Sequence, residues 1–271
     1  MKINFTDKHL TATLALAALL FAVASLEAAA QAEKPNPPAK ADSTQKVPAA
    51  SDVIAKFIKA IGGKEAYLKI QSQHAKGRFE MPAQGITGDM EVFHKRPNKM
   101  HIKVNIPALG DVLTGFDGKV GWSVNAAMGP MLMEGKQLEQ MREQADFNSI
   151  LHDPEEYKSM ETVEITQFEK KECFKLKLVK KSGQEITEYY DTKTGLLAGM
   201  VMTQESPFGP VTATNVLEEY KKFNEVLFAT KVTQRMGPIE QTMILSSYEL
   251  DKVEESIFEL PEQIKALVKK P

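Results

Sequence analysis

Few side chains in this 271-residue chain have the type and spacing needed for metal binding. Beyond residue 32 the histidines are His74, His94, His101 and His152. A turn centred on Pro97-Asn98 would put His94 and His101 roughly opposite each other on two paired strands. Two histidines with no third ligand at motif spacing form a weak metal site. We therefore expect no bound metal and no cofactor.

Catalytic signatures are equally sparse. The chain contains no H-E-x-x-H, G-x-S-x-G, P-loop or G-x-G-x-x-G motif. The carboxylate pairs Glu155-Glu156, Glu218-Glu219 and Glu254-Glu255 fall in polar turns or at strand ends, where solvated charge is the ordinary state. Cys173, the only cysteine, lies in "KKECFKLKLV" and is expected to be a small buried side chain. We expect a protein without enzymatic activity.

Methionine gives the clearest positive signal, since 13 methionines occur and all but the first lie beyond the N-terminal segment. Methionine is flexible and polarisable, and it is frequent at apolar surfaces that bind varied partners. Met128, Met131 and Met133 follow neither a strand nor a helix period, which predicts an apolar loop acting as the lid or rim of a cavity. Met200 and Met202 share one strand face, which favours a core or a cavity wall.

The only tryptophan lies in "LTGFDGKVGWSVN", residues 113–125. Asp117-Gly118 between two alternating runs predicts a two-residue hairpin turn. The expected cross-strand pairs are Phe116–Lys119, Gly115–Val120 and Leu113–Trp122. Trp122 then shares an apolar face with Leu113 and Val124, beside the open space left by Gly115. It is either a plug in a packed core or part of a cavity wall.

The N-terminal segment has the form of a secretory signal peptide. Lys2 and Lys8 precede an apolar run over residues 11–25, and Ala30-Gln31-Ala32 supplies small residues before a cleavage site. The run is too short to span a bilayer. We predict cleavage after Ala32, no lipid anchor because no cysteine lies near that site, and a soluble periplasmic protein.

The remaining chain reads as a linker followed by one domain. Residues 33–50 are rich in Pro, Ala and Lys, which is typical of an extended linker. Residues 51–271 begin with a helix capped by Ser51 and ended by Gly62-Gly63. From residue 73, alternating runs predict about nine to eleven antiparallel strands in meander order. Helical patterns interrupt them at residues 135–153 and in the tail. With a net charge of −2 and mixed signs along the chain, no nucleic-acid surface is indicated.

Such a wide sheet with few helices must curl, which predicts a mainly β fold shaped as an incomplete barrel. Several stretches resemble the LolA/LolB-like superfamily, and most closely its periplasmic outer membrane lipoprotein-sorting branch. They are "IAKFIKAIGGKEAYLKIQS", "VFHKRPNKMHIK", "GFDGKVGWSVN", "EYYDTKTGLL" and "NEVLFATKVTQ…ELDKVEESIFELP". The resemblance spans residues 51–262 and implies a curved antiparallel half-barrel that is covered by helices and holds acyl chains.

The resemblance implies a non-enzymatic carrier that binds acyl chains of lipoproteins or lipids for sorting to the outer membrane. Its partners would be an acylated lipoprotein or lipid and proteins of the inner and outer membranes, and the carrier would act as a monomer. The expected ligand contacts are Leu113, Trp122, Val124, Met128, Met131, Met133, Met200 and Met202. The alternative is a structural or sensor protein of the envelope, with the cavity filled by its own side chains.

Overall fold

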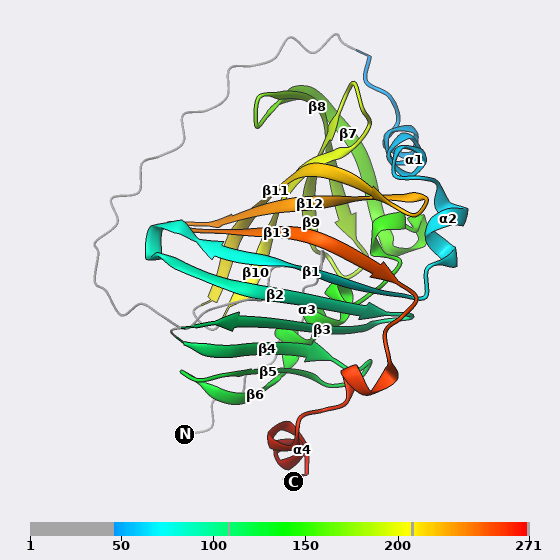
Figure 1. Ribbon diagram of the computed structural model, residues 1–271. Coiled ribbons are helices and arrows are strands. Elements are labelled where there is room, and N and C mark those ends of the chain that lie inside the picture. The colour runs from blue at the N-terminus through cyan, green and yellow to red at the C-terminus, as the bar shows by residue number, and fades with distance from the viewer. Residues whose placement is uncertain (1–45, 108, 207–208, 270–271) are drawn as a thin grey trace, which may run out of the picture.

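The computed structural model describes residues 46–107, 109–206 and 209–269 (Figure 1). The expected signal peptide and most of the expected linker, up to residue 45, lie outside the described residues. Residues 46–49 have no regular structure, and the first helix begins at Ala50. The expected domain boundaries stay a prediction.

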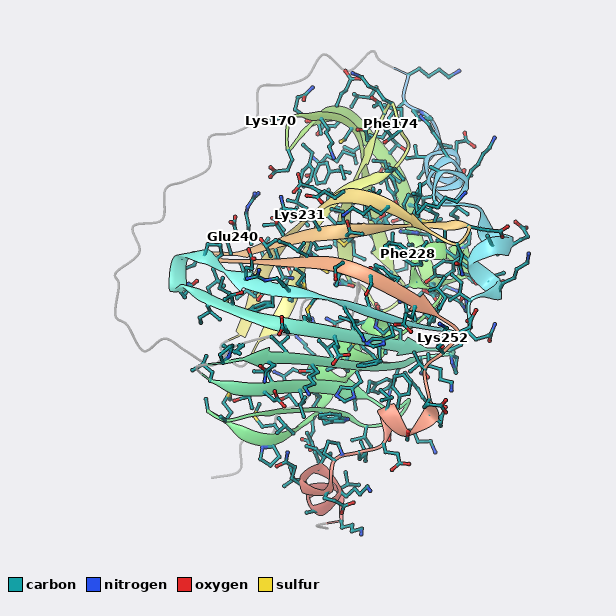
Figure 2. All side chains as sticks on the ribbon, in the orientation of Figure 1. Lys170, Phe174, Phe228, Lys231, Glu240 and Lys252 are labelled. Carbon is teal, nitrogen blue, oxygen red and sulfur yellow. The ribbon has the colours of Figure 1, made fainter. Side chains whose placement is uncertain are left out.

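The described chain is dominated by one antiparallel sheet with 13 strands. They are β1 (Ser72–Met81), β2 (Ile86–Lys95), β3 (Lys99–Ile106), β4 (Gly110–Phe116), β5 (Gly121–Asn125), β6 (Gly129–Met133), β7 (Tyr157–Phe168), β8 (Lys171–Lys180), β9 (Glu185–Asp191), β10 (Leu197–Ser206), β11 (Gly209–Phe223), β12 (Val226–Met236) and β13 (Ile239–Leu250). The sheet is curved and open (Figure 1), which confirms the expected mainly β half-barrel. The expected nine to eleven strands are too few, partly because β6 lies where the sequence predicted a loop. Figure 2 shows polar side chains such as Lys231 and Glu240 projecting from β12 and β13.

The helices are short and lie on and beside the sheet (Figure 1). They are α1 (Ala50–Ala60), α2 (Lys64–Lys69), α3 (Gly135–Gln144) and α4 (Glu262–Val268), with 3₁₀ turns η1 (Pro82–Gln84), η2 (Ser149–Leu151), η3 (Pro154–Glu156) and η4 (Glu255–Phe258). The N-cap of α1 is Ala49. The prediction of Ser51 as cap is therefore wrong, because the helix begins earlier and Ser51 lies in its first turn. Gly62, with φ +120°, follows the helix as expected.

Two meanders build the sheet, β1 to β6 and β7 to β13, and they join where β1 pairs with β13. The α3 segment connects β6 to β7, which are the two edge strands. At the junction, a Cβ on Gly77 would lie 2.1 Å from the carbonyl oxygen of Ile244, so only glycine fits this close approach. The register between β1 and β13 shifts at the same point, between Lys76 and Gly77.

The hairpin between β4 and β5 differs from the sequence prediction by its turn. Phe116 pairs with Gly121, and Gly115 pairs with Trp122, so the expected register is wrong. The physical reason is the Asp117 side chain, whose Oδ1 accepts from the backbone N–H groups of Lys119 (2.8 Å) and Val120 (2.7 Å). These bonds stabilise a longer turn over residues 117–120 instead of a two-residue one.

Two apolar clusters fill the concave side of the sheet. One is built on β1 to β4 and includes Phe79, Ile102 and Phe116. The other packs α1 on β8 to β11 and includes Phe57 and Tyr190. Val232 of β12 packs against both clusters. The region between the clusters therefore lies over the central strands.

Candidate functional site

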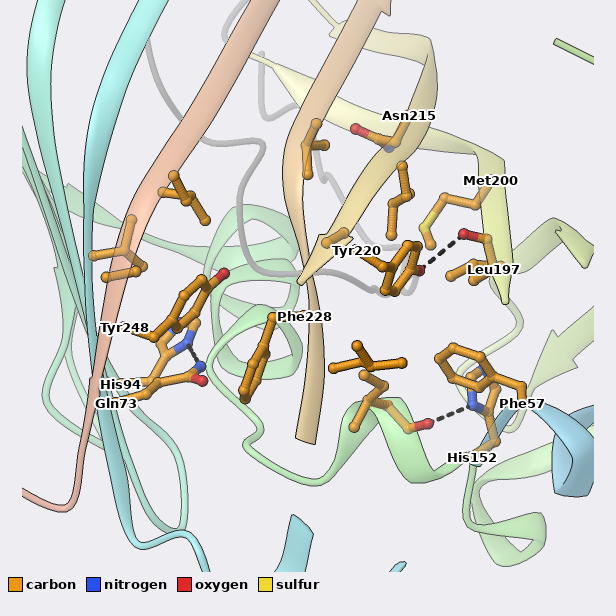
Figure 3. A pocket seen from close by; sticks show the side chains of 18 residues that line it. Phe57, Gln73, His94, His152, Leu197, Met200, Asn215, Tyr220, Phe228 and Tyr248 are labelled. Atoms are coloured by element: carbon orange, nitrogen blue, oxygen red, sulfur yellow. Dashed lines mark hydrogen bonds between the residues drawn. The ribbon is translucent and has the colours of Figure 1, made fainter. Parts of the chain in front are cut away.

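A cavity of ≈ 150 Å³ lies in this central region, where the two apolar clusters meet (Figure 3). Strands β1, β2 and β10 to β13 form its wall, and α1 and the segment around η2 close it. Its lining residues are Phe57, Gln73, Ala75, Val92, His94, Ile150, His152, Leu197, Met200, Asn215, Leu217, Tyr220, Leu227, Phe228, Ala229, Val232, Leu245 and Tyr248. Most of this surface is apolar, so the cavity suits a hydrophobic ligand.

Aromatic rings form much of the wall between the two ends of the cavity. The rings of Phe228 and Tyr248 are stacked, with centroids 4.6 Å apart and 16° between their planes. The hydroxyl of Tyr220 donates to the carbonyl oxygen of Leu197 at 2.9 Å, which leaves the ring facing the cavity (Figure 3). Ile150, Leu227 and Phe228 are only half-buried. Other lining residues, such as Gln73 and Tyr248, are half-buried as well.

One end of the cavity carries the half-buried Gln73 and the buried His94, which face each other across β1 and β2. The side-chain Nε2 of Gln73 lies 2.9 Å from Nδ1 of His94. Burial lowers the pKa of His94 to about 4, so this imidazole is neutral at pH 7. Figure 3 shows the Gln73 amide directed toward Phe228.

The other end holds a buried ionic group around His152. Nδ1 of His152 lies 2.9 Å from the carbonyl oxygen of Ile150, and its Nε2 lies 3.0 Å from Oε2 of Glu188. The Tyr190 hydroxyl donates to the same Oε2 at 2.6 Å. With an acceptor at each ring nitrogen, His152 suits the protonated form, which donates from both.

The shifts in pKa agree with an ion pair. Burial by itself would lower the pKa of His152, but the charge and hydrogen bond of Glu188 outweigh it and raise the pKa above 6.5. Burial would raise the pKa of Glu188, but His152, Tyr190 and Lys180 lower it below 4.5. The pair therefore compensates its own charge beside an otherwise apolar cavity.

The methionines predicted from the sequence lie at different places. Met200 of β10 lines the cavity. Met202 is buried in the same cluster, two residues further along the strand, and is not a lining residue. Met131 and Met133 belong to β6, so the prediction of a loop over them is wrong. The strand forms because β6 pairs with β5, and Met133 packs against the cluster built on β1 to β4. Met128 is exposed in the turn before β6.

Leu113, Trp122 and Val124 were expected beside the cavity, and the structure places them across the sheet from it. Gly115 pairs with both Trp122 and His101, and it alternates along β4 with Phe116, which faces the concave cluster. Trp122 therefore lies on the opposite face, with its indole over Gly115 and its ring centroid 5.4 Å from that of His101. Leu113 and Val124 pair on the same face.

The C-terminal segment crosses this opposite face. Nδ1 of His101 lies 2.8 Å from the carbonyl oxygen of Ile257, and Lys95 contacts Glu255 at 3.1 Å. Helix α4 contacts β6. Trp122 is consequently only 1 % exposed. Ligand binding by the eight residues named from the sequence stays a prediction, and Met200 is the one that lies in the cavity wall.

The histidines do not form the expected arrangement. His94 pairs with Met100, and His101 pairs with Phe93, so the prediction that the two histidines face each other is wrong. The pairing register of β2 with β3 is one residue off the expected register, and this places the two imidazoles on opposite faces. Within the described residues, no group of three or more His, Cys, Asp or Glu side chains is placed to hold a metal ion.

Sequence reasoning missed Gln73, His94 and His152 as cavity residues. Strand alternation could have placed Gln73 and His94 on the face of Ala75 and Val92, because they follow the same period of two. The pairing of β1 with β13, which brings Tyr248 beside them, joins segments far apart in the sequence and leaves no local signal.

Comparison with known proteins identifies the fold. No protein-family model and no curated protein matches the sequence. Among solved structures, a DUF1329 family protein from Desulfovibrio piger matches with a TM-score of 0.52 and 11% identity, covering 78% of this chain and 97% of that one. A LolA superfamily protein from Nitrosomonas europaea gives 0.51 and 11%, covering 79% and 99%. A domain from Vibrio parahaemolyticus, described as an outer membrane lipoprotein-sorting protein, gives 0.50 and 12%, covering 82% and 97%.

The chain therefore has the LolA-like fold, as the sequence resemblance predicted. The matched region covers nearly the whole length of each solved protein. In the described part of the chain, no helix is both long enough and apolar enough to cross a membrane.

Proposed function

We propose that the protein is a non-enzymatic carrier that binds acyl chains of lipoproteins or lipids in the periplasm. The observation that carries this proposal is the apolar cavity on the concave face of a LolA-like sheet. The periplasmic location rests on the signal peptide predicted for residues 1–32. The carrier would act as a monomer, with an acylated lipoprotein or lipid as cargo and partners at the inner and outer membranes.

The driving force for binding would be hydrophobic. Each methylene moved from water into the cavity contributes about 0.8 kcal/mol. A cavity of ≈ 150 Å³ is similar in volume to an engineered protein cavity that binds benzene. A long acyl chain therefore needs additional space, which the half-buried side chains of Ile150, Leu227 and Phe228 would provide by moving.

Among the methionines, we propose Met200 as a direct ligand contact and Met202 as support for the same wall. A flexible thioether adapts to chains of different shape without a large change in packing energy. This property suits a carrier, because a carrier must also release what it binds.

The first test is native mass spectrometry of the protein purified from a periplasmic extract without detergent. We expect a mass above that of the apoprotein, and lipid analysis of an organic extract should identify an acylated species. A bare apoprotein mass that persists after incubation with vesicles of bacterial phospholipid would favour the alternative, an envelope protein whose cavity is filled by its own side chains.

A cavity-filling variant tests the site itself. Ala229 lines the cavity, so Ala229→Trp should fill much of it and lower uptake of the apolar dye N-phenyl-1-naphthylamine at least tenfold. Val163→Trp is the matched control, because Val163 is exposed on β7 and is not a lining residue. Equal dye binding by the two folded variants would show that the dye binds elsewhere and would overturn the assignment of this cavity.

A further inference from the structure

The Gln73–His94 end of the cavity holds polar atoms that have no hydrogen-bond partner. They are Oε1 of Gln73 and Nε2 of His94, and both are buried. The His94 residue is only 8 % exposed. Buried polar atoms are normally paired, because leaving one unpaired costs about 1–3 kcal/mol. Both residues line the cavity, but neither atom has accessible surface in it, so a group inside the cavity would supply the missing partners once a side-chain rotation turns these atoms toward it.

The two unpaired atoms form one donor and one acceptor. If the Gln73 amide N–H donates to Nδ1 of His94, the neutral imidazole carries its proton on Nε2. The free groups are then an Nε2–H donor on His94 and the Oε1 acceptor of Gln73. Reversing the amide and the tautomer exchanges the two roles and leaves the same complement of one donor and one acceptor.

This end of the cavity is also uncharged. Burial holds the pKa of His94 at about 4, and the lining contains no Asp, Glu, Lys or Arg. Arg96, which follows the last residue of β2, directs its guanidinium to the carbonyl oxygens of Ile70 and Tyr67 and to the side chain of Asn148. At the far end, Glu188 compensates the charge of His152. A ligand carboxylate placed here would be buried without a counter-charge, which is costly.

We propose that the Gln73–His94 pair binds an uncharged group with both a hydrogen-bond donor and an acceptor, a carboxamide or a hydroxyl, attached to the apolar chain in the cavity. This proposal rests on the carrier function and specifies the part of the ligand that enters the site. An acceptor-only group, such as a methyl ester, satisfies just one of the two atoms. A carboxylate is excluded on two grounds, because it is charged and because it has no hydrogen-bond donor.

The test is competition against N-phenyl-1-naphthylamine at pH 7.5 with four probes that share a ten-carbon chain: decanamide, 1-decanol, methyl decanoate and sodium decanoate. The variants are Gln73→Met, which keeps the side-chain length and removes the amide, and Gln71→Met as control. Gln71 is exposed near the start of β1 and does not line the cavity. Thermal unfolding establishes that each variant is folded.

We expect Gln73→Met to weaken decanamide and 1-decanol by roughly 2- to 12-fold, the factor that one neutral hydrogen bond provides. Methyl decanoate should change less than twofold, and Gln71→Met should change none of the probes. In the wild-type protein, decanoate should compete at least tenfold more weakly than 1-decanol.

Two results would overturn the proposal while leaving the carrier function intact. One is equal loss of decanamide and methyl decanoate in Gln73→Met. The other is competition by decanoate within threefold of 1-decanol in the wild-type protein, which would place the head group in solvent and needs no folded variant. If none of the probes displaces the dye, and the dye itself does not bind, the carrier function fails together with this inference.

Discussion

The His152–Glu188 ion pair gives a stability prediction that depends on pH. Glu188 is 2 % exposed and His152 is 5 % exposed, so neither charge is solvated when its partner is removed. Glu188→Gln keeps the shape of the side chain and removes its charge. Breaking a buried ion pair by removing one partner typically costs about 3–5 kcal/mol. We expect a loss of this size in the free energy of unfolding at pH 5.5.

The pH dependence follows from the directions of the two pKa shifts. The pKa of His152 is raised above 6.5, so its contribution is complete below that value and is lost as pH rises through the folded pKa. The pKa of Glu188 is lowered below 4.5, so its contribution is complete above that value and is lost as pH falls through the folded pKa. The pair therefore stabilises the fold most between pH 4.5 and pH 6.5.

Urea unfolding followed by the fluorescence of Trp122, the only tryptophan, measures this effect. The destabilisation by Glu188→Gln should be largest near pH 5.5 and smaller at pH 8.5, because the contribution of protonated His152 to the wild-type protein is lost as pH rises through its folded pKa. Tyr190→Phe is the control, because it leaves both charges in place and removes the hydroxyl that donates to Oε2 and lies 3.4 Å from Nε2 of His152. It should cost about 1.5–3 kcal/mol. Equal destabilisation by Glu188→Gln at both pH values would refute the assignment of a charged His152.

Two further predictions concern buried side chains. In Gly115→Ala, the new Cβ would lie 2.5 Å from the Trp122 ring. The free energy of unfolding in urea should therefore fall by about 1–3 kcal/mol, and the tryptophan emission should shift. A variant as stable as the wild-type protein would contradict the close approach. Burial, with a further contribution from Asp191, raises the pKa of Cys173 to about 11, so a disulfide reagent at pH 8 should modify it slowly in the native protein and rapidly in urea; fast native modification would contradict its burial.

The sequence was sufficient to predict the fold class. Alternating strands, glycine-containing turns and the helix before Gly62-Gly63 are local signals, and the structure confirms a curved antiparallel half-barrel with helices beside it. Strand β6 escaped detection because Pro130 and closely spaced methionines obscure its alternation. The register of the β4–β5 hairpin was mispredicted because the Asp117 side chain stabilises a longer turn, which residue type alone does not specify.

The cavity was less predictable than the fold. Periodicity shows which residues share a face of one hairpin, and it placed Met200 correctly on an inward face. It does not show which distant strands become neighbours. His94 and Tyr248 come together only through the pairing of β1 with β13, and His152 joins them from an irregular segment after η2.

The junction between β1 and β13 has a consequence for the order of folding. Within each meander, neighbouring strands are joined by short connections, so those pairings close small loops. Pairing Gln73 with Leu250 instead closes a loop that contains nearly the whole domain, which makes it entropically costly and slow. The cavity spans this junction, so it is complete only when the two meanders have joined. A ligand that binds there would stabilise the pairing of β1 with β13, which is the last step of folding. It would therefore slow the separation of these two strands.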